Sequence, residues 1–494
     1  MRAALFTIFL SLSVVHAATL HKIADIPFPK GSAEIIAYSV ATGELISTRQ
    51  HGKHASLQVL KLPAGADPKT LSLDDRYSIS SVATHPEKPL AAATLIPFKP
   101  LEAQGEVVLV DLQTEAEIAR YPVGYHPDCV NFSKDGRLIL VACEGEFGNS
   151  KLQTPGSLSV IEWERGFAAD YHLPVPAPGG TALRAPHGNG WMDLEPEYVS
   201  ESNGIAYLTL QENNAIARFN LASRQWLPVW ELGSWSITGD FSDRDGPWGE
   251  TSIQSHVPIH AMPQPDTLTT LVIGGRTFVA TANEGENAGG TRVKHLGLKG
   301  PTLDREYRRE LKKKYGIHPQ HDMALGRLQV SPIEGDLDGD GDIDELVAFG
   351  TRSFSIWDGE TGERVFDSGQ TFEAQGSTRA GTHNWDLARA DRMDSRSDNR
   401  GPEPEAIASG LISGHPYLAV ATERQGSIYL YQVETAAAPK LVAIIDEGVE
   451  SGLYSPESLL FLPENSNPYN APVLVCGWEG SERVTFYKIL PNQP

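Results

Sequence analysis

The stretch GPEPEAIASGLISGHPYLAVATERQGSIYLYQV, residues 401–433, contains one full copy of the pattern that decides the fold. Its apolar runs, rich in Ile, Ala, Val and Tyr, are separated by Gly-His-Pro and Arg-Gln-Gly turns, which is typical of short strands. We therefore expect a three-strand antiparallel meander. Glu403 and Glu405 stand at the start of its first strand, and Glu423 stands at the end of its second. These two ends share one edge of a hairpin, so the carboxylates should lie side by side.

The same meander recurs along most of the chain. Besides 401–433, we expect units at residues 33–62, 78–112, 126–163, 194–226, 264–286, 344–366 and 455–490. Repeats of this kind, about 45–60 residues apart, are typical of β-propellers. We predict an all-β chain folded as a seven- or eight-bladed β-propeller, with eight blades favoured. A stack of sandwich domains is the structural alternative.

The unit at 264–286 lacks a third strand of its own, and we expect that strand to be displaced to residues 326–331. If that fragment belongs to the next unit instead, the count falls to seven. Between the two lies an insertion at about residues 287–325. Within it, the region near 303–316 predicts one short helix, because Gly316 supplies the helix end and Lys and Arg gather in its last turns.

Charge restricts the partners. The chain has 41 Lys and Arg against 63 Asp and Glu, a net charge of −22. A protein this acidic repels nucleic acid and anionic lipid surfaces, so we expect neither as a partner. It suits cations. We expect a monomer.

The ends of the chain suggest export. Residues 1–17 read MRAALFTIFLSLSVVHA, with one Arg, an apolar core and a small-residue cleavage site, as in a secretory signal peptide. No later run reaches the roughly 18 apolar residues of a membrane span. We expect residues 18–494 to form a single propeller domain that is secreted or periplasmic, without a C-terminal anchor.

The cysteines are few for an exported chain of 494 residues: Cys129, Cys143 and Cys476. This number does not indicate a disulfide scaffold. We expect buried thiols inside strands, and one bridge with a thiol left over remains the alternative.

Acids recur at the equivalent strand ends of other units. We predict that they gather at one face of the propeller as a ring: Asp128, Glu144, Glu197, Glu212, Asp266, Glu284, Glu405, Glu423, Glu457 and Glu479. So many like charges need bound divalent cations, arginine partners or raised pKa values. Arg49, Arg352 and Arg424 at strand ends are the candidate arginine partners.

A second acidic pattern is local. Acids at positions 1, 3, 5 and 9 with Gly at position 6 wrap a loop around one hard cation, and this spacing is found in Asp336, Asp338, Asp340, Gly341 and Asp344. Asp342 would offer its backbone carbonyl. Position 12 is Val347 rather than Glu, so an EF-hand is not indicated. We predict a structural calcium loop between strands.

Other polar residues form no motif with a defined spacing. The stretch DFSDRDG, residues 240–246, has looser spacing and is expected to be a polar surface loop. No role is assigned to the histidines between strands, His256, His260, His318, His321 and His383.

Four phrases carry a family resemblance: LEPEYVS (194–200), GGRTFVATANEGE (274–286), DLDGDGDIDELVAFGTRSFSIWD (336–358) and ATERQGSIYLYQV (421–433). Together they resemble the choice-of-anchor I family, exported bacterial propeller proteins whose members end in varied surface anchors. The resemblance covers nearly the whole chain after residue 17. This chain stops at Pro494, just after its last strand, so the resemblance implies export but not attachment.

The resemblance also implies candidate chemistry, because some relatives carry alkaline phosphatase labels and phytase-type propellers use an acidic, calcium-filled channel. Calcium on the carboxylate ring would bind a phosphoester and activate water, with Glu284 or Glu405 as general base. The alternative is a non-enzymatic exported module that recognises a glycan or a protein. In the first case the acids converge within about 4–6 Å. In the second they are paired off, and Trp191, Trp248 and Trp385 are exposed on loops.

Overall fold

Most of the chain is described by a computed structural model. The described residues are 18–99, 103–145, 154–179, 183–186, 194–246, 252–253, 255–298, 300–378, 383–386, 393–447 and 451–491. The expected signal peptide at 1–17 lies outside them. Among the helices of this part of the chain, none has the length and apolarity that crossing a membrane requires.

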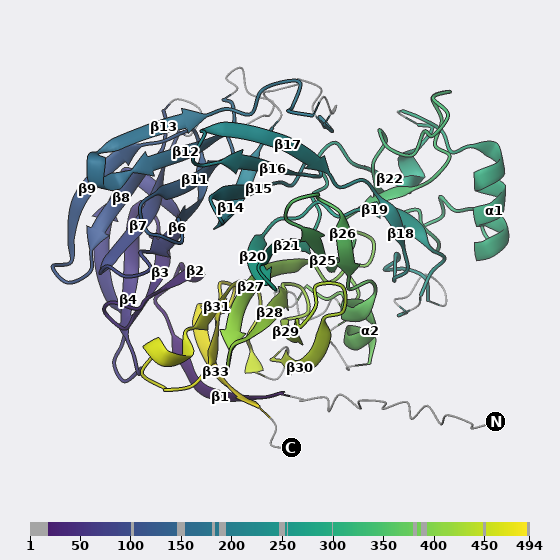
Figure 1. Cartoon of the computed structure of the whole chain (residues 1–494). Coiled ribbons are helices and arrows are strands. Elements are labelled where there is room, and N and C mark those ends of the chain that lie inside the picture. Colours follow the sequence, from purple (N-terminus) through teal and green to yellow (C-terminus); the bar gives the residue numbers. More distant parts are fainter. Residues whose placement is uncertain are drawn as a thin grey trace, which may run out of the picture.

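Strands dominate the structure and form eight sheets (Figure 1). The prediction of an all-β propeller is confirmed, and the eight sheets match the eight expected units in number. Seven sheets have four strands each and one has five. The sequence left open whether there are seven or eight blades. Of the eight sheets, seven supply an innermost strand to the central channel.

The first four channel sheets follow the sequence order. Their strands are β2 (Ser32–Ser39), β3 (Glu44–His51), β4 (His54–Lys61) and β5 (Lys69–Asp74); β6 (Tyr77–Thr84), β7 (Leu90–Pro97), β8 (Glu106–Asp111) and β9 (Ala116–Pro122); β10 (Pro127–Phe132), β11 (Ile139–Cys143), β12 (Ser157–Glu162) and β13 (Phe167–Tyr171); β14 (Pro196–Ser202), β15 (Ile205–Leu210), β16 (Ala215–Asn220) and β17 (Gln225–Glu231).

The other three channel sheets contain the insertion and the closure. Their strands are β20 (Leu268–Ile273), β21 (Arg276–Asn283), β25 (Ser353–Asp358) and β26 (Arg364–Asp367); β27 (Pro404–Ile412), β28 (His415–Thr422), β29 (Ser427–Gln432) and β30 (Lys440–Asp446); β31 (Pro456–Leu462), β32 (Val473–Trp478), β33 (Arg483–Pro491) and β1 (Ala18–Pro27).

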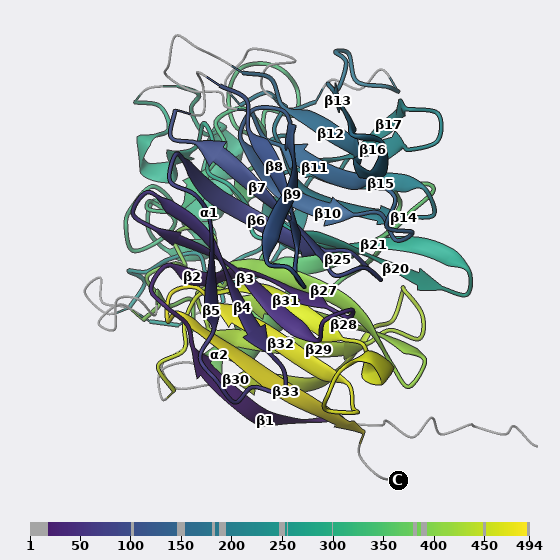
Figure 2. The same cartoon turned by 90° about the vertical axis from the view of Figure 1, so that its left-hand side faces the viewer.

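The ring closes with strands from both ends of the chain. β1 pairs antiparallel with β33, from Ala18 opposite Pro491 to Pro27 opposite Arg483 (Figure 2). The first described strand thereby becomes the outermost strand of the last sheet. The innermost strands of neighbouring sheets contact one another around the ring and enclose a channel cavity of about 280 Å³.

The eighth sheet lies beside the ring and corrects one expectation. It consists of β18 (Trp235–Ile237), β19 (Ile259–Met262), β24 (Val347–Phe349), β23 (Gln329–Val330) and β22 (Thr291–Arg292). The displaced third strand was expected at 326–331, but β21 instead pairs with β25. Every residue of β25 is buried, so it is the apolar central strand that this sheet needs, whereas β23 pairs only in the eighth sheet.

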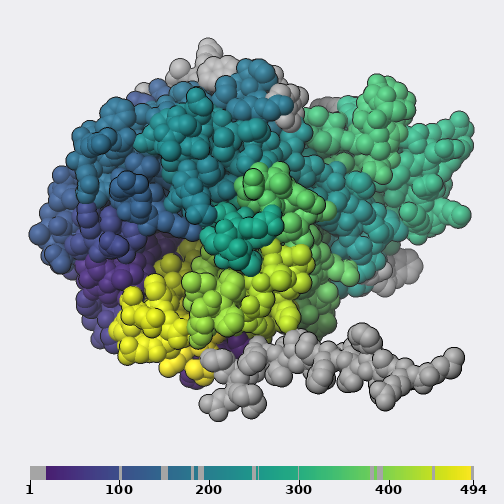
Figure 3. Space-filling model, viewed as in Figure 1, coloured from purple at the N-terminus to yellow at the C-terminus, as the bar shows by residue number. Residues whose placement is uncertain are grey.

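The helix expected near 303–316 is confirmed as α1 (Arg305–Tyr315). The Asp304 side chain accepts a hydrogen bond from the backbone N–H of Tyr307 at 2.7 Å, and Gly316 ends the helix with a φ of 73°. Leu311 packs toward the eighth sheet, and this region projects from the side of the ring (Figure 3). A second helix, α2 (Thr371–Ser377), was not expected.

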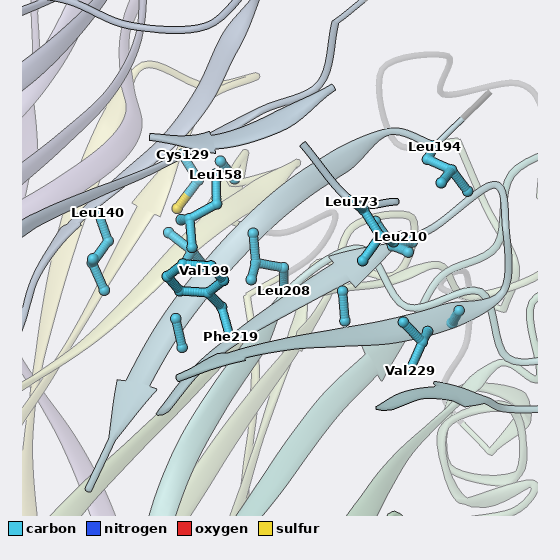
Figure 4. Close-up of a cluster of buried hydrophobic side chains, with 14 of the residues drawn as sticks. Cys129, Leu140, Leu158, Leu173, Leu194, Val199, Leu208, Leu210, Phe219 and Val229 are labelled. Carbon is cyan, nitrogen blue, oxygen red and sulfur yellow. The ribbon is translucent and has the colours of Figure 1, made fainter. Parts of the chain in front are cut away.

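Apolar packing between sheets holds the ring together. All five residues of β11 are buried, and successive side chains of a strand point to opposite faces. Leu140 therefore packs with Leu208 of the following sheet, whereas Val141 packs with Leu109 of the preceding one. Figure 4 shows the cluster that contains Leu140 and Leu208. The three cysteines lie inside such strands, and each is a free, buried thiol.

Candidate functional site: an acidic ring at one end of the channel

A repeated tripeptide places one set of acids. A residue, a proline and then an acid lie at or just before the start of the innermost strand in five sheets: 126–128, 195–197, 264–266, 403–405 and 455–457. Four of the first residues have a left-handed backbone, His126, Gln264, Glu403 and Ser455. Non-glycine residues rarely adopt this conformation, and it often marks functional positions.

The acids lie where strand pairing is irregular. The pairing of β10 with β11 shifts between Pro127 and Cys129, so that Asp128 has no cross-strand partner. The same irregularity leaves Glu197, Glu405, Glu457 and, in the first sheet, Glu34 outside the ladder. Bulged residues re-aim their side chains, which explains how acids on central strands come to face one another. In β6 the equivalent irregularity contains Ser80, so that sheet contributes no acid here.

The second set of acids follows the second strands. Glu144, Glu212, Glu284, Glu423 and Glu479 come directly after β11, β15, β21, β28 and β32, or within two residues of them. They share an edge with the first set because the two strands of each hairpin are antiparallel. The structure thus brings the sequence-predicted acids to one end of the channel. Glu479 is exposed, whereas Glu284 is only 7% exposed.

The acids interact as one electrostatic unit. Burial raises the pKa of Asp128 to about 8, with further increases from Glu144 and Asp266. Burial likewise raises the pKa of Glu423 to about 7 and that of Glu34 to about 7. The same cause raises the pKa values of a larger group, to which neighbouring carboxylates add: Glu197, Asp266, Glu284, Glu405 and Glu457. Such a cluster takes up protons or cations.

Three of these acids converge. Asp266, Glu284 and Glu405 each offer an oxygen, and these atoms lie within 4.8 Å of one another. They come from the start of β20, the end of β21 and the start of β27. The buried Oε2 of Glu405 has no hydrogen-bond partner, and Gln211 Nε2 donates to Glu284 Oε2 at 3.0 Å. We call Asp266, Glu284 and Glu405 the acidic trio.

Arginines neutralise only one side of the ring. Arg400 lies 2.7 Å from Glu284 and 3.2 Å from Glu403, and Arg424 lies 2.8 Å from both Glu403 and Glu423. Burial alone would raise the pKa of Glu403, but Arg400, Arg396 and Arg424 outweigh it and lower this pKa.

The charged surroundings of Asp266 and Glu405 differ from those of Glu284 and Glu403. Within the described ranges, no Lys or Arg forms an ion pair with Asp266 or Glu405. The carboxyl groups of Asp266 and Glu405 interact with each other. A side-chain hydrogen bond with Glu405 lowers the pKa of Asp266, whereas burial raises it. Two carboxylates in such contact share a proton or a cation.

Two predicted arginine partners lie elsewhere. Arg352 begins the third strand of its sheet, because β25 joins β21, and its guanidinium pairs with Glu373 at 2.5 Å. Arg49 donates from Nε to the carbonyl oxygen of Lys30 at 3.1 Å. Of the three predicted arginines, the structure places Arg424 against the ring.

The sequence analysis missed three contributors to the ring, Arg396, Arg400 and Glu34. The two arginines belong to the segment before β27, whose polar composition resembles a linker. Arg400 could have been found from its position, because it stands three residues before Glu403. Glu34 was missed because no proline precedes it.

The predicted calcium loop is partly assembled. Oxygens of Asp336, Asp338 and Asp344 lie within 4.8 Å of one another. Asp336 accepts hydrogen bonds from the backbone N–H groups of Gly339 and Gly341 at 2.8 and 3.0 Å, which curls the loop. The side chains of Asp340 and Asp342 are not part of this group. Carboxylate oxygens on an exposed loop are the ligands that calcium prefers, so these residues fit the ion.

One of the three aromatic residues named for the alternative hypothesis, Trp385, is not displayed as that hypothesis requires. Trp385 is 6% exposed and therefore buried. Trp191 and Trp248 lie outside the described residues.

The chain is similar to known proteins in its sequence and in its fold. It is 29% identical over 198 residues to Gigasin-3a of Magallana gigas, covering 35% of this chain and 69% of that protein. Its fold resembles the WD40 domain of Toxoplasma gondii coronin, with a TM-score of 0.50 at 9% identity over 97% of this chain and 88% of the other. The β-propeller domain of Myceliophteria thermophila Cps50 (Swd1) gives a TM-score of 0.48 at 10% identity over 95% and 99%.

At these identities the two solved structures concern the fold alone. A family assignment comes from the sequence, because the choice-of-anchor I domain matches residues 34–436. This match includes six of the seven innermost strands and the whole acidic trio. The chain belongs to the choice-of-anchor I domain family.

Proposed function

We propose that this chain is an exported, divalent-cation-dependent phosphoester hydrolase, and that the acidic trio holds its catalytic cation. The observation that carries the proposal is the convergence of Asp266, Glu284 and Glu405 within 4.8 Å. Carboxylate oxygens prefer hard cations such as Ca²⁺, Mg²⁺ and Mn²⁺. The sign of the pKa shifts supports the same reading, because a cation replaces the protons that the trio otherwise retains.

Glu284, Glu405 and Arg400 have separate chemical roles in this proposal. When bound, the cation would polarise a phosphoryl oxygen and lower the pKa of a water molecule. Burial raises the pKa of Glu284 to about 8 and raises that of Glu405 also. A carboxylate of this pair that does not bind the cation keeps its raised pKa and accepts a proton near neutral pH. Arg400, beside Glu284, supplies positive charge for a phosphate anion.

The competing function is a binding module for a glycan or a protein. The pairing of Arg400 and Arg424 with Glu403, Glu284 and Glu423 favours it, because paired charges serve as a scaffold. The burial of Trp385 argues against the form in which exposed aromatic residues bind the ligand. We therefore place hydrolysis first.

Export belongs to the proposal as well. Residues 1–17 have the composition of a signal peptide, and the family's description as a choice-of-anchor domain accords with a place outside the cell. Amino-terminal sequencing of protein from the extracellular or periplasmic fraction tests this directly. A first residue at Ala18 supports export, and a retained Met1 contradicts it.

The hydrolase proposal is tested with purified protein and a set of phosphomonoesters and phosphodiesters. Each substrate is assayed with chelator and then with calcium, magnesium or manganese added back. We expect cation-dependent hydrolysis that Glu405→Gln abolishes and Glu479→Gln, at the exposed rim, retains. Cation binding without hydrolysis of any phosphoester would leave the binding module as the better account.

A further inference from the structure

A second group of ligand-type side chains lies away from the ring, between the loop after β18 and the segment before β27. Its members are Asp240, Asp245, His256, His383 and Asp394. The stretch 240–246 was expected to be a surface loop, but this is wrong: Asp240 is 2% exposed, and the side chain of Asp245 is 4% exposed. His383 is 2% exposed, and Asp394 is fully buried.

His256 acts as the counter-charge of two of the acids. Its ring nitrogens lie 3.4 Å from Asp240 Oδ1 and 3.1 Å from Asp245 Oδ2. Burial alone would lower the pKa of His256, but these two carboxylates raise it to about 9. This pairing leaves one oxygen of Asp240 to face the other side, toward His383.

His383 and Asp394 are buried without adequate partners. Among the residues that the structure describes, neither ring nitrogen of His383 has a hydrogen-bond partner, and Oδ2 of Asp394 has none. Buried polar side chains are almost always hydrogen-bonded, so such groups call for an explanation. Burial and the carboxylates of Asp240 and Asp245 raise the pKa of Asp394 to about 9, as expected for an acid that lacks a positive neighbour.

The separations fit a shared metal ion better than hydrogen bonds. His383 Nε2 lies 3.4 Å from Asp240 Oδ2 and 3.9 Å from Asp394 Oδ1, which exceeds the usual hydrogen-bond length. Two ligands about 2.1 Å from a tetrahedral ion are about 3.4 Å apart. The three ligand atoms lie within 4.8 Å of one another, so one ion can reach them all.

Surrounding hydrogen bonds fix these side chains. The backbone N–H of Asp240 donates to Glu373 of α2 at 3.0 Å, and Arg352 donates to the carbonyl oxygen of Asp240. Asp394 N–H donates to the carbonyl oxygen of His383 at 3.0 Å, and Ser397 donates to Asp394. Metal ligands are typically held by such outer contacts, and this gives Arg352 a positioning role far from the acidic ring.

We propose that Asp240, His383 and Asp394 form a binding site for one divalent transition-metal ion of the zinc, manganese and iron(II) class. Imidazole nitrogen together with carboxylate oxygen suits these ions, whereas the all-oxygen loop at 336–344 suits calcium. The ion ties the loop after β18 to the segment that leads to Arg396 and Arg400. Through that segment it holds in place the arginines that contact Glu403 and Glu284.

The test uses the full chain and measures bound metals directly. After dialysis against chelator, zinc, manganese or cobalt(II) is added and unbound metal is removed. We expect about one tightly held transition-metal ion per chain, lost in His383→Gln and in Asp394→Asn but retained in His260→Gln. His260 is a suitable control because it pairs with Glu345 at 3.3 Å and belongs to none of the ligand groups found among the described residues.

Two further readouts keep the result decisive. Cobalt(II) bound to wild-type protein should show the visible absorption of a low-coordinate site with nitrogen ligation, and zinc should raise the melting temperature of the wild type, even if a variant fails to fold. Glu405→Gln should leave this ion in place, which separates the site from the acidic trio. Wild-type protein that retains no transition metal, or a folded His383→Gln variant with unchanged metal content, overturns the proposal.

Discussion

Replacing Asp128 by Asn should remove the part of the pH dependence of stability that Asp128 contributes to the acidic ring. The pKa of Asp128 rises from near 4 to about 8 in the folded chain. Its folded pKa is raised, so the protonated acid is the form that the fold tolerates. Stability is therefore highest near or below the unfolded pKa and falls as the pH rises through about 8.

The magnitude follows from the same values. Each tenfold change in proton concentration is worth about 1.4 kcal/mol for one group. Between about pH 5 and about pH 8, Asp128 therefore costs the cation-free wild type up to about 4 kcal/mol. The figure is an upper value, because the acids around Asp128 exchange protons with it. Asp128→Asn has nearly the same shape without the charge, so it escapes this cost.

The assay is urea unfolding in chelator and in saturating calcium, at about pH 5 and about pH 8. In chelator, we expect the wild type to lose several kcal/mol across this range and Asp128→Asn to lose clearly less. Calcium should restore the wild type at the higher pH and help the variant less. Asp67→Asn, on an exposed loop, is the control and should behave as the wild type. Equal pH slopes for wild type and Asp128→Asn would refute the reasoning.

Three further changes test other parts of the structure. Arg400→Gln removes the positive charge beside Glu284, so cation affinity measured by calorimetry should increase by at least about 1 kcal/mol; weaker binding would contradict the role assigned to the trio. Asp336→Asn replaces one of the two oxygens that accept loop hydrogen bonds and removes one carboxylate of the calcium loop, so its melting temperature should fall below that of the wild type mainly when calcium is present. Leu140→Ala leaves a cavity between the third and fourth sheets and should lower the free energy of unfolding by about 2–5 kcal/mol; a loss under about 1 kcal/mol would mean that this contact is loosely packed.

The repeated strands and the shared edges of the acids could be predicted because both depend on local geometry. A hairpin places Glu405 and Glu423 at one edge whatever surrounds it, and the helix at Arg305–Tyr315 carries its own end signals. The bulges that turn Asp128 and Glu405 toward the channel are also local, although only the structure reveals them.

The rest depends on long-range contacts that no local pattern reports. The insertion lets β21 pair with β25 across 69 residues of intervening chain, which merges two expected units. His383 meets Asp240 through loops from different sheets, so the spacing of histidines and acids in the sequence gave no indication of a cluster. Arg400 reaches Glu284 from a segment whose composition indicates only a polar linker.

The pairing of β1 with β33 also imposes an order of assembly. β1 is the first described strand to be synthesised and β33 is the last, so the edge of β1 stays unmatched while the whole of the intervening chain is made. An unmatched edge is a site for association with other chains. Partial chains should therefore be prone to association with other chains until β33 is made. A variant that lacks β33 should remain prone to such association. Closure of the ring therefore waits for the synthesis of β33.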